Sequence, residues 1–225
     1  MKKLSKKYKE SLSLIEKGKK YTIEEACDLV KKTAKAKFDQ SVDVSFKLNI
    51  DPKQADQQLR GTISLPHGNG KTSKVLAITD KVEEAKKAGA DYVGQQDMLD
   101  KITKENWFDF DVIVATPNMM GLLGKMGKVL GPKGLMPNPK TGTVSPNIGQ
   151  AVKEIKDGKI SYRNDKDGNL AVNFGKSSFT EKKLVDNLKT VIETVNKIKP
   201  SAVKGTYILS CTISSTYGPA IKLAI

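Results

Sequence analysis

Lysines alternate with glycines between Gly124 and Lys140, and these residue types suit contact with a ligand rather than catalysis. The segment has no acidic residue, and its lysines are Lys125, Lys128, Lys133 and Lys140. Glycines leave backbone N–H groups accessible and lysines add positive charge, so the pattern favours contact with a polyanion. An extended loop kept soluble by its lysines is the alternative that composition leaves open.

Few residues offer catalytic or cofactor chemistry. Gly70-Lys71-Thr72 matches the end of a P-loop, but Leu65 stands where that motif needs its first glycine. No G-x-G-x-x-G follows the apolar stretch 74–78, which argues against a dinucleotide site. Residues 165–169 contain part of a calcium loop without its closing glutamate, so we expect a hairpin turn there. With His67 as the sole histidine, the sequence predicts neither an enzyme nor a cofactor.

The two cysteines, Cys27 and Cys211, are too few for the disulfide framework of a secreted domain. A His/Cys zinc cluster is also excluded, because the chain has a single histidine. Cys27 falls on the apolar stripe of a predicted helix, so we expect its thiol in the core. No metal site is predicted.

The charge of the chain points to a polyanionic partner. Its 225 residues include 39 Lys and Arg against 25 Asp and Glu, a net charge of +14. No apolar stretch approaches the roughly 20 residues of a membrane span, and no secretory signal is visible. A membrane-surface role would need a basic amphipathic helix, which the sequence lacks. We therefore expect a cytoplasmic, basic, globular protein that binds nucleic acid.

Helix and strand signals at the beginning of the chain are clear. Thr22 and Glu25 are spaced as a capping box, and the apolar residues that follow predict a helix to about Lys35. Apolar residues at 42, 44, 46, 48 and 50 alternate with polar ones, which predicts a strand with one solvated face. A second strand is expected at 60–65.

The pattern changes in the middle of the chain. Short apolar strands at 74–78, 91–93 and 111–116 alternate with helices at 82–88 and 98–103, which is typical of a parallel sheet. Residues 121–149 are expected to be rich in loops, and a short helix is predicted at 151–155.

Alternation returns near the end of the chain, in 160–162, 170–174 and 207–213. Between these strands a long helix is predicted, with Thr180 as its cap and Pro200 beyond its end. The expected fold class is α/β and α+β: residues 1–66 and 160–225 form a discontinuous α+β sandwich of the split βαβ type. Residues 67–159 form an inserted, Rossmann-like three-layer α/β domain. Hinge positions are expected at Pro66, Gly68, Gly70 and Gly158, where the chain crosses between the domains.

Several segments together resemble one known family. They are Lys37–Val42, Arg60–Lys71, Ala115–Pro117, Gly124–Lys140, Tyr162–Lys166 and Ser215–Pro219. On these residues the chain resembles the bacterial ribosomal protein L-one family, from about residue 20 to 223. The resemblance implies two domains and binding of a stalk segment of large-subunit rRNA, mainly by the domain that contains both chain ends. It also implies a role in release of deacylated tRNA from the exit site, repression of the protein's own operon through its mRNA, and a monomer within the ribosome.

The same resemblance implies which residues contact RNA. They are Lys37, Phe38, Ser41, Asp165, Lys166, Ser210, Thr216, Tyr217 and Gly218, with Lys125, Lys128, Lys133 and Lys140 as additional candidates. Tyr217 departs from the family, which usually has methionine there; a tyrosine can stack or donate a hydrogen bond.

The residue types at these positions support an RNA contact independently of the family. Phe38 lies outside the alternation of 42–50, so either an RNA contact or a core position is open to it. The turn Ser215–Pro219 offers hydroxyls and a close backbone approach, which suit phosphates and 2′-hydroxyls better than base edges. The runner-up function is an α/β enzyme for a phosphorylated small molecule, with Lys71 or segment 124–140 as its anion site.

Overall fold

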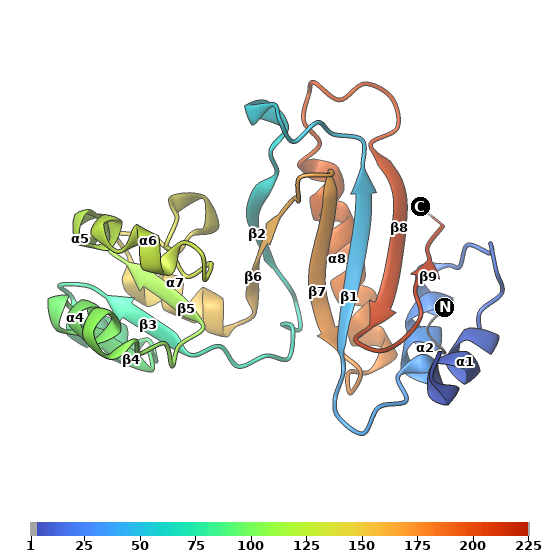
Figure 1. Cartoon of the computed structure of the whole chain (residues 1–225), viewed down its shortest axis with the longest axis horizontal. Coiled ribbons are helices and arrows are strands. Elements are labelled where there is room, and N and C mark those ends of the chain that lie inside the picture. The colour runs from blue at the N-terminus through green and yellow to red at the C-terminus, as the bar shows by residue number, and fades with distance from the viewer. Residues whose placement is uncertain (1–3, 225) are drawn as a thin grey trace. The chain divides into compact units, whose positions relative to one another are not determined.

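The computed structural model describes residues 4–224 of the chain. Its internal contacts divide the chain into two compact units (Figure 1). Unit 1 comprises residues 1–70 and 160–225, and unit 2 comprises residues 71–159. No helix among the described residues is long and apolar enough to cross a bilayer.

Unit 1 is built on an antiparallel sheet with strand order β7-β1-β8-β9 (Figure 1). The strands are β1 (Ser41–Leu48), β7 (Asn169–Lys176), β8 (Ile208–Ser215) and β9 (Ile221–Lys222). In β1, Val42, Val44, Phe46 and Leu48 are buried while the residues between them are not, so the predicted alternation is confirmed. One face of this sheet therefore joins the core, and the other is polar.

The described residues of unit 1 form three α-helices: α1 (Lys6–Ser13), α2 (Ile23–Thr33) and α8 (Glu181–Lys197). Helices α2 and α8 pack on each other and on the apolar face of the sheet. The Thr22–Glu25 capping box is confirmed, because each side chain bonds the other residue's backbone N–H. Cys27 is buried in this core, as predicted. Thr180 occupies the N-cap of α8, as predicted, although its side chain makes no capping hydrogen bond.

A two-stranded ribbon, β2 (Arg60–Ser64) and β6 (Lys159–Arg163), completes unit 1, after a 3₁₀ turn at Ala55–Gln57. Its inward side chains, Ile63 and Tyr162 among them, join the same core. Gly61 is required here, because a Cβ at that position would lie 2.5 Å from the Tyr162 hydroxyl. The two strands of the ribbon therefore lie close together, and their inward side chains pack on the core of unit 1.

Unit 2 is a three-layer structure around a parallel sheet with order β4-β3-β5. Its strands are β3 (Val75–Ile78), β4 (Tyr92–Gly94) and β5 (Val112–Ala115). On one face, α3 (Val82–Lys87) and α7 (Ile148–Lys156) pack around Val75 and Ala77. On the other, α4 (Gln96–Glu105), α5 (Met120–Lys125) and α6 (Gly127–Leu130) enclose Leu76 and Ile78. The predicted mixed α/β fold is confirmed.

The expectation of a loop-rich stretch at 121–149 is wrong in part. Helices α5 and α6 lie in it, the 3₁₀ turn Pro117–Met119 precedes them and the 3₁₀ turn Pro139–Thr141 follows. Glycines lower intrinsic helix propensity, which hides these helices in the sequence. Leu123 and Leu130 are completely buried, so packing against the sheet stabilises these helices in spite of their low helix propensity.

The first crossing between the units lies at 70/71, four residues beyond the predicted 66/67 boundary. The fully buried Asn187 of α8 explains this position. Its Oδ1 accepts the His67 N–H at 3.1 Å, and its Nδ2 donates to the Gly68 carbonyl at 2.8 Å. Gly70 has a positive φ of 72°, and a Cβ there would lie 2.7 Å from the Lys176 Cγ. Segment 66–70 is therefore fixed to unit 1.

Candidate nucleic-acid interface

Two connections of unit 1 bring several candidate RNA contacts together at one end of β1. Lys37 and Phe38 lie in the connection from α2 to β1, and Thr216 to Gly218 lie in the connection from β8 to β9. The Thr216 N–H and hydroxyl both donate to the carbonyl of Ser41, at 3.1 and 3.3 Å. The Tyr217 N–H donates to the Gln40 Oε1 at 3.0 Å. These bonds hold residues about 175 positions apart in sequence in one fixed arrangement.

An exposed aromatic pair is the most distinctive feature of this end. The rings of Phe38 and Tyr217 meet edge to face, with centroids 5.5 Å apart and an interplanar angle of 88°. Phe38 is 51% exposed and Tyr217 is 70% exposed, which excludes the core position for Phe38. Exposed aromatic rings are the side chains on which unstacked RNA bases stack.

Gly218 has a structural reason to be glycine. Its N–H donates to the Ser215 carbonyl at 3.0 Å, and a Cβ at 218 would lie only 2.3 Å from the Ser215 Oγ. That Oγ is buried and has no hydrogen-bond partner among residues 4–224. A larger residue at 218 would therefore force the Ser215 side chain to move, next to the turn that carries Tyr217.

The remaining candidates of unit 1 lie at the opposite end of the sheet. Ser210 pairs with Lys47 in the β1–β8 ladder, and Lys47 pairs with Asn169 at the base of the β6–β7 hairpin. Six residues separate Ser41 from Lys47 along β1, which corresponds to about 20 Å. The predicted contacts thus form two clusters, one at each end of β1, and do not form a single site.

Asp165 shapes the hairpin that carries Lys166. Its Oδ1 accepts the N–H groups of Asp167 and Asn169 at 2.9 and 2.7 Å, and its Oδ2 accepts the Asn169 Nδ2 at 2.9 Å. The bonds from Asn169 hold the pKa of the Asp165 carboxyl below its usual range. The carboxylate fixes the turn, and Lys166 is exposed beside it.

The polar face of the sheet connects the two clusters, and the sequence motifs did not assign it to the site. Ser45 faces Thr212 across the β1–β8 ladder, Asp43 faces Ser214, and Thr212 faces Lys222 of β9. None of these side chains is buried. Alternation over 42–50 was the available signal, because it leaves every second residue of β1 on this face.

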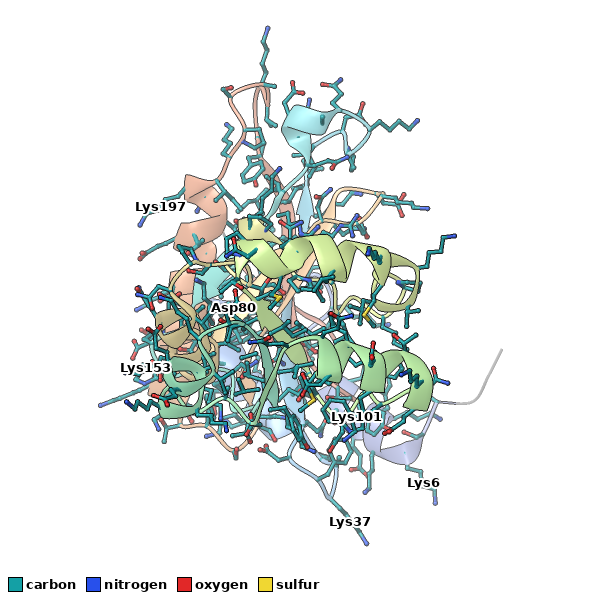
Figure 2. All side chains as sticks on the ribbon, turned by 90° about the vertical axis from the view of Figure 1, so that its left-hand side faces the viewer. Lys6, Lys37, Asp80, Lys101, Lys153 and Lys197 are labelled. Carbon is teal, nitrogen blue, oxygen red and sulfur yellow. The ribbon has the colours of Figure 1, made fainter. Side chains whose placement is uncertain are left out.

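Positive charge is concentrated in unit 1. This unit has 25 Lys and Arg against 14 Asp and Glu, a net charge of +11. Unit 2 has 14 against 11, a net charge of +3. Figure 2 shows the side chain of Lys37 extending away from the ribbon into open space. Unit 1 therefore has the stronger attraction for a polyanion.

The four candidate lysines of unit 2 are all exposed. Lys125 ends α5, Lys128 lies in α6 and Lys140 in the following 3₁₀ turn. The Lys133 ammonium lies 3.7 Å from the centroid of the Phe108 ring, a cation–π contact that holds the glycine-rich segment on α4's side of the sheet. None of the four forms an ion pair with any residue in the described part of the chain.

Lys71, the alternative anion site, already forms an ion pair with Asp111. Its Nζ lies 2.6 Å from the Asp111 Oδ1, and this bond lowers the pKa of the Asp111 carboxyl. The structure therefore does not favour an enzyme with Lys71 as a phosphate ligand. Within residues 4–224 no group of three His, Cys, Asp or Glu side chains could hold a metal ion.

Comparison with known proteins gives one consistent result. Residues 30–219 match the model of the ribosomal protein L1p/L10e family. The chain is 54% identical over 224 residues to "Large ribosomal subunit protein uL1" of Mycoplasma capricolum subsp. capricolum, covering 99% of both chains. It is 55% identical over 226 residues to the protein of the same name from Mesoplasma florum, covering 100% of both.

Proposed function

The chain belongs to the ribosomal protein L1 family, and on that premise we propose that it binds the stalk segment of large-subunit rRNA mainly through unit 1. It is an RNA-binding ribosomal protein of the large subunit and not an enzyme. Its place of action is the ribosome in the cytoplasm.

The observation that carries the proposal is the coincidence of charge and exposed rings in unit 1. A net charge of +11 attracts the phosphate backbone. The Phe38–Tyr217 pair, more than half exposed in both residues, adds stacking surface at one end of the sheet. Charge alone would bind any polyanion, whereas rings fixed by hydrogen bonds favour RNA with unstacked bases.

The spacing of the two clusters supports an extended footprint. Hydroxyls on the polar face, such as those of Ser45, Thr212 and Ser214, lie between the clusters. Hydroxyls and lysines suit 2′-hydroxyls and phosphates, which an RNA helix displays along its shallow groove. An RNA segment that spans about 20 Å of the sheet would contact both clusters at once.

Two finer functions follow from the family and belong to the same proposal. The protein, a monomer within the ribosome, takes part in release of deacylated tRNA from the exit site. It also represses translation of its own operon by binding an mRNA that imitates the rRNA site. Both RNAs would then compete for unit 1, so an excess of stalk rRNA fragment should displace the mRNA.

The two units are proposed to fold as separate domains, with the moving joint just after Gly70 and at Gly158. Segment 66–70 is fixed by Asn187, so Pro66, Gly68 and Gly70 would move with unit 1. Gly158 has a φ of 97°, which suits glycine alone at this crossing.

The experiment is binding of a stalk rRNA fragment, measured against a scrambled RNA of equal length. The proposal predicts tighter binding of the stalk fragment by at least roughly 10³-fold, the low end of specific recognition of nucleic acids. Equal affinity for both RNAs would contradict it. Saturable stabilisation by a nucleotide, with no RNA preference, would instead favour the enzyme.

A further inference from the structure

A cavity of about 270 Å³ opens beside the aromatic pair of unit 1. Helix α1 forms one wall, and the segment from the end of α2 to β1 forms the other. Three aromatic side chains line it: Tyr8 of α1, Phe38 and Tyr217. The exposed rings therefore also form the mouth of a hollow.

The inner surface of this cavity has an unused hydrogen-bond donor. Gln40 lines it and is only 1% exposed. Its Oε1 accepts the Tyr217 N–H at 3.0 Å, which fixes the orientation of the amide and leaves Nε2 as the free end. No residue among 4–224 accepts a hydrogen bond from this Nε2. This Nε2 is not one of the fully buried polar atoms without a partner, so it is accessible from the cavity and can donate to a ligand that enters it.

Two further buried polar residues line the same cavity. Ser11 is 2% exposed and Thr33 is 3% exposed. The Ser11 hydroxyl donates to the Thr33 carbonyl at 3.1 Å, and the Thr33 hydroxyl donates to the Val30 carbonyl at 3.0 Å. Both oxygens keep lone pairs that can accept a hydrogen bond. The cavity thus offers both a donor and acceptors.

Lysines alone supply the charge that lines the cavity. They are Lys7, Lys35 and Lys37, and the lining includes no acidic residue. Lys35 pairs with Glu10 at 3.0 Å, whereas Lys7 and Lys37 form no ion pair with any described residue. Two uncompensated cations beside aromatic rings suit a group that is anionic at one end and flat at the other.

We propose that this cavity receives one unstacked nucleotide of the bound RNA. Its base lies against Tyr8, Phe38 and Tyr217 and accepts a hydrogen bond from the Gln40 Nε2 through a carbonyl oxygen or a ring nitrogen. Its phosphates lie near Lys7 and Lys37. The proposal rests on RNA binding by unit 1 and gives α1 a function, because α1 closes the cavity and is fixed there by the Ser11 and Glu10 bonds.

The test uses the full chain and a panel of stalk rRNA fragments, each with one unpaired nucleotide made abasic. Ala36, which lines the cavity and is half-buried, is changed to fill it: Ala36→Trp. Stacking of one base predicts a loss of roughly 5- to 150-fold, both for Ala36→Trp and for one abasic position. Combined, the two changes should cost no more than either alone, because both remove the same interaction.

A second variant keeps the test decisive if Ala36→Trp fails to fold. Gln40→Glu keeps an oxygen for the Tyr217 N–H and removes the Nε2 donor. It should weaken binding of every fragment, and least for the fragment whose abasic position is the nucleotide that enters the cavity. Leu14→Trp is the matched control, because Leu14 is 45% exposed and does not line the cavity. It should leave affinity unchanged.

The outcomes separate this proposal from the proposed function. The protein could bind the stalk fragment specifically with no sensitive abasic position, or the losses from Ala36→Trp and from the abasic position could add. Either result would overturn the proposal that the cavity receives a nucleotide and would leave the proposed function intact. Loss of all preference for the stalk fragment in the unchanged protein would overturn both.

Discussion

Units 1 and 2 differ in net charge and in where their basic residues lie in the sequence. In unit 2, Lys71, Lys74 and Lys156 pair with aspartates across the sheet edge, at 2.6, 2.6 and 3.3 Å. Outside residues 121–149, unit 2 has 10 basic and 11 acidic residues, so its positive charge comes entirely from that one segment. Unit 1 has an excess of 11 positive charges. Unit 2 is thus nearly neutral outside one basic segment, and unit 1 has the larger net positive charge.

Sheet type explains the same contrast. The parallel sheet of unit 2 is covered on both faces by helices, so it has no open face for a partner. The antiparallel sheet of unit 1 is covered on one face and presents a row of polar side chains on the other. A long nucleic acid can lie along the second surface and not along the first.

The largest expected effect of a side-chain change concerns the aromatic pair. Removing both rings with Phe38→Ala and Tyr217→Ala should weaken binding of the stalk fragment roughly 5- to 150-fold for each base that no longer stacks on a ring. Both rings are exposed, so the midpoint of thermal unfolding should change little. Filter binding and calorimetric unfolding measure the two quantities. Unchanged affinity would remove the rings from the site.

A smaller effect is expected from the basic segment of unit 2. Replacing Lys125, Lys128, Lys133 and Lys140 with alanine should reduce the slope of log affinity against log salt. The reduction should be up to about 0.9 for each phosphate that the variant no longer neutralises. The matched control replaces four lysines of unit 2 outside the segment: Lys86, Lys87, Lys101 and Lys104. Equal slopes for the two variants would show that the segment does not contact RNA.

Thr216→Val should have a modest effect on both stability and binding. The hydroxyl donates to the Ser41 carbonyl, so its loss should cost about 1 kcal/mol of unfolding free energy. RNA affinity should fall by more than this loss of stability explains only if the hydroxyl oxygen also accepts a hydrogen bond from RNA. Denaturant titration and RNA titration of the same variant distinguish these roles. A stable variant with full affinity would make this turn an ordinary one.

The smallest effect concerns the hairpin and depends on pH. The pKa of Asp165 is lower in the folded chain, so its carboxylate stabilises the fold above the unfolded pKa of about 3.9. That contribution is lost as pH falls through the lower, folded value. The difference in melting temperature between the unchanged protein and Asp165→Asn should therefore shrink below about pH 4. A constant difference from pH 7 to pH 3 would contradict this account.

The parts of the fold predicted from sequence depended on local patterns. Alternation at 42–50 located β1 and its polar face, and the Thr22–Glu25 pair located the start of α2. Helices α5 and α6 were missed because glycines lower local propensity, whereas burial of Leu123 and Leu130 is a tertiary effect. The boundary at 70/71 depends on Asn187, more than 100 residues away, and no local pattern reports such a contact.

The candidate site shows the same limit. Motifs identified Phe38 and Tyr217, but their contact depends on hydrogen bonds between two distant connections. No local pattern singles out Gln40, a buried polar residue, or Tyr8, which only the docking of α1 brings to the cavity. Patterns thus identify residues that face solvent, and only the fold shows which of them meet.

The most direct test of the central claim separates the two units. Joining Gly70 to Ile160 with a short Gly/Ser linker should leave a folded unit 1 that keeps its preference for the stalk fragment over scrambled RNA. Residues 71–159 alone should fold, bind RNA weakly and show no such preference. Specific binding by residues 71–159, with none by a folded unit 1, would contradict the assignment of recognition to unit 1.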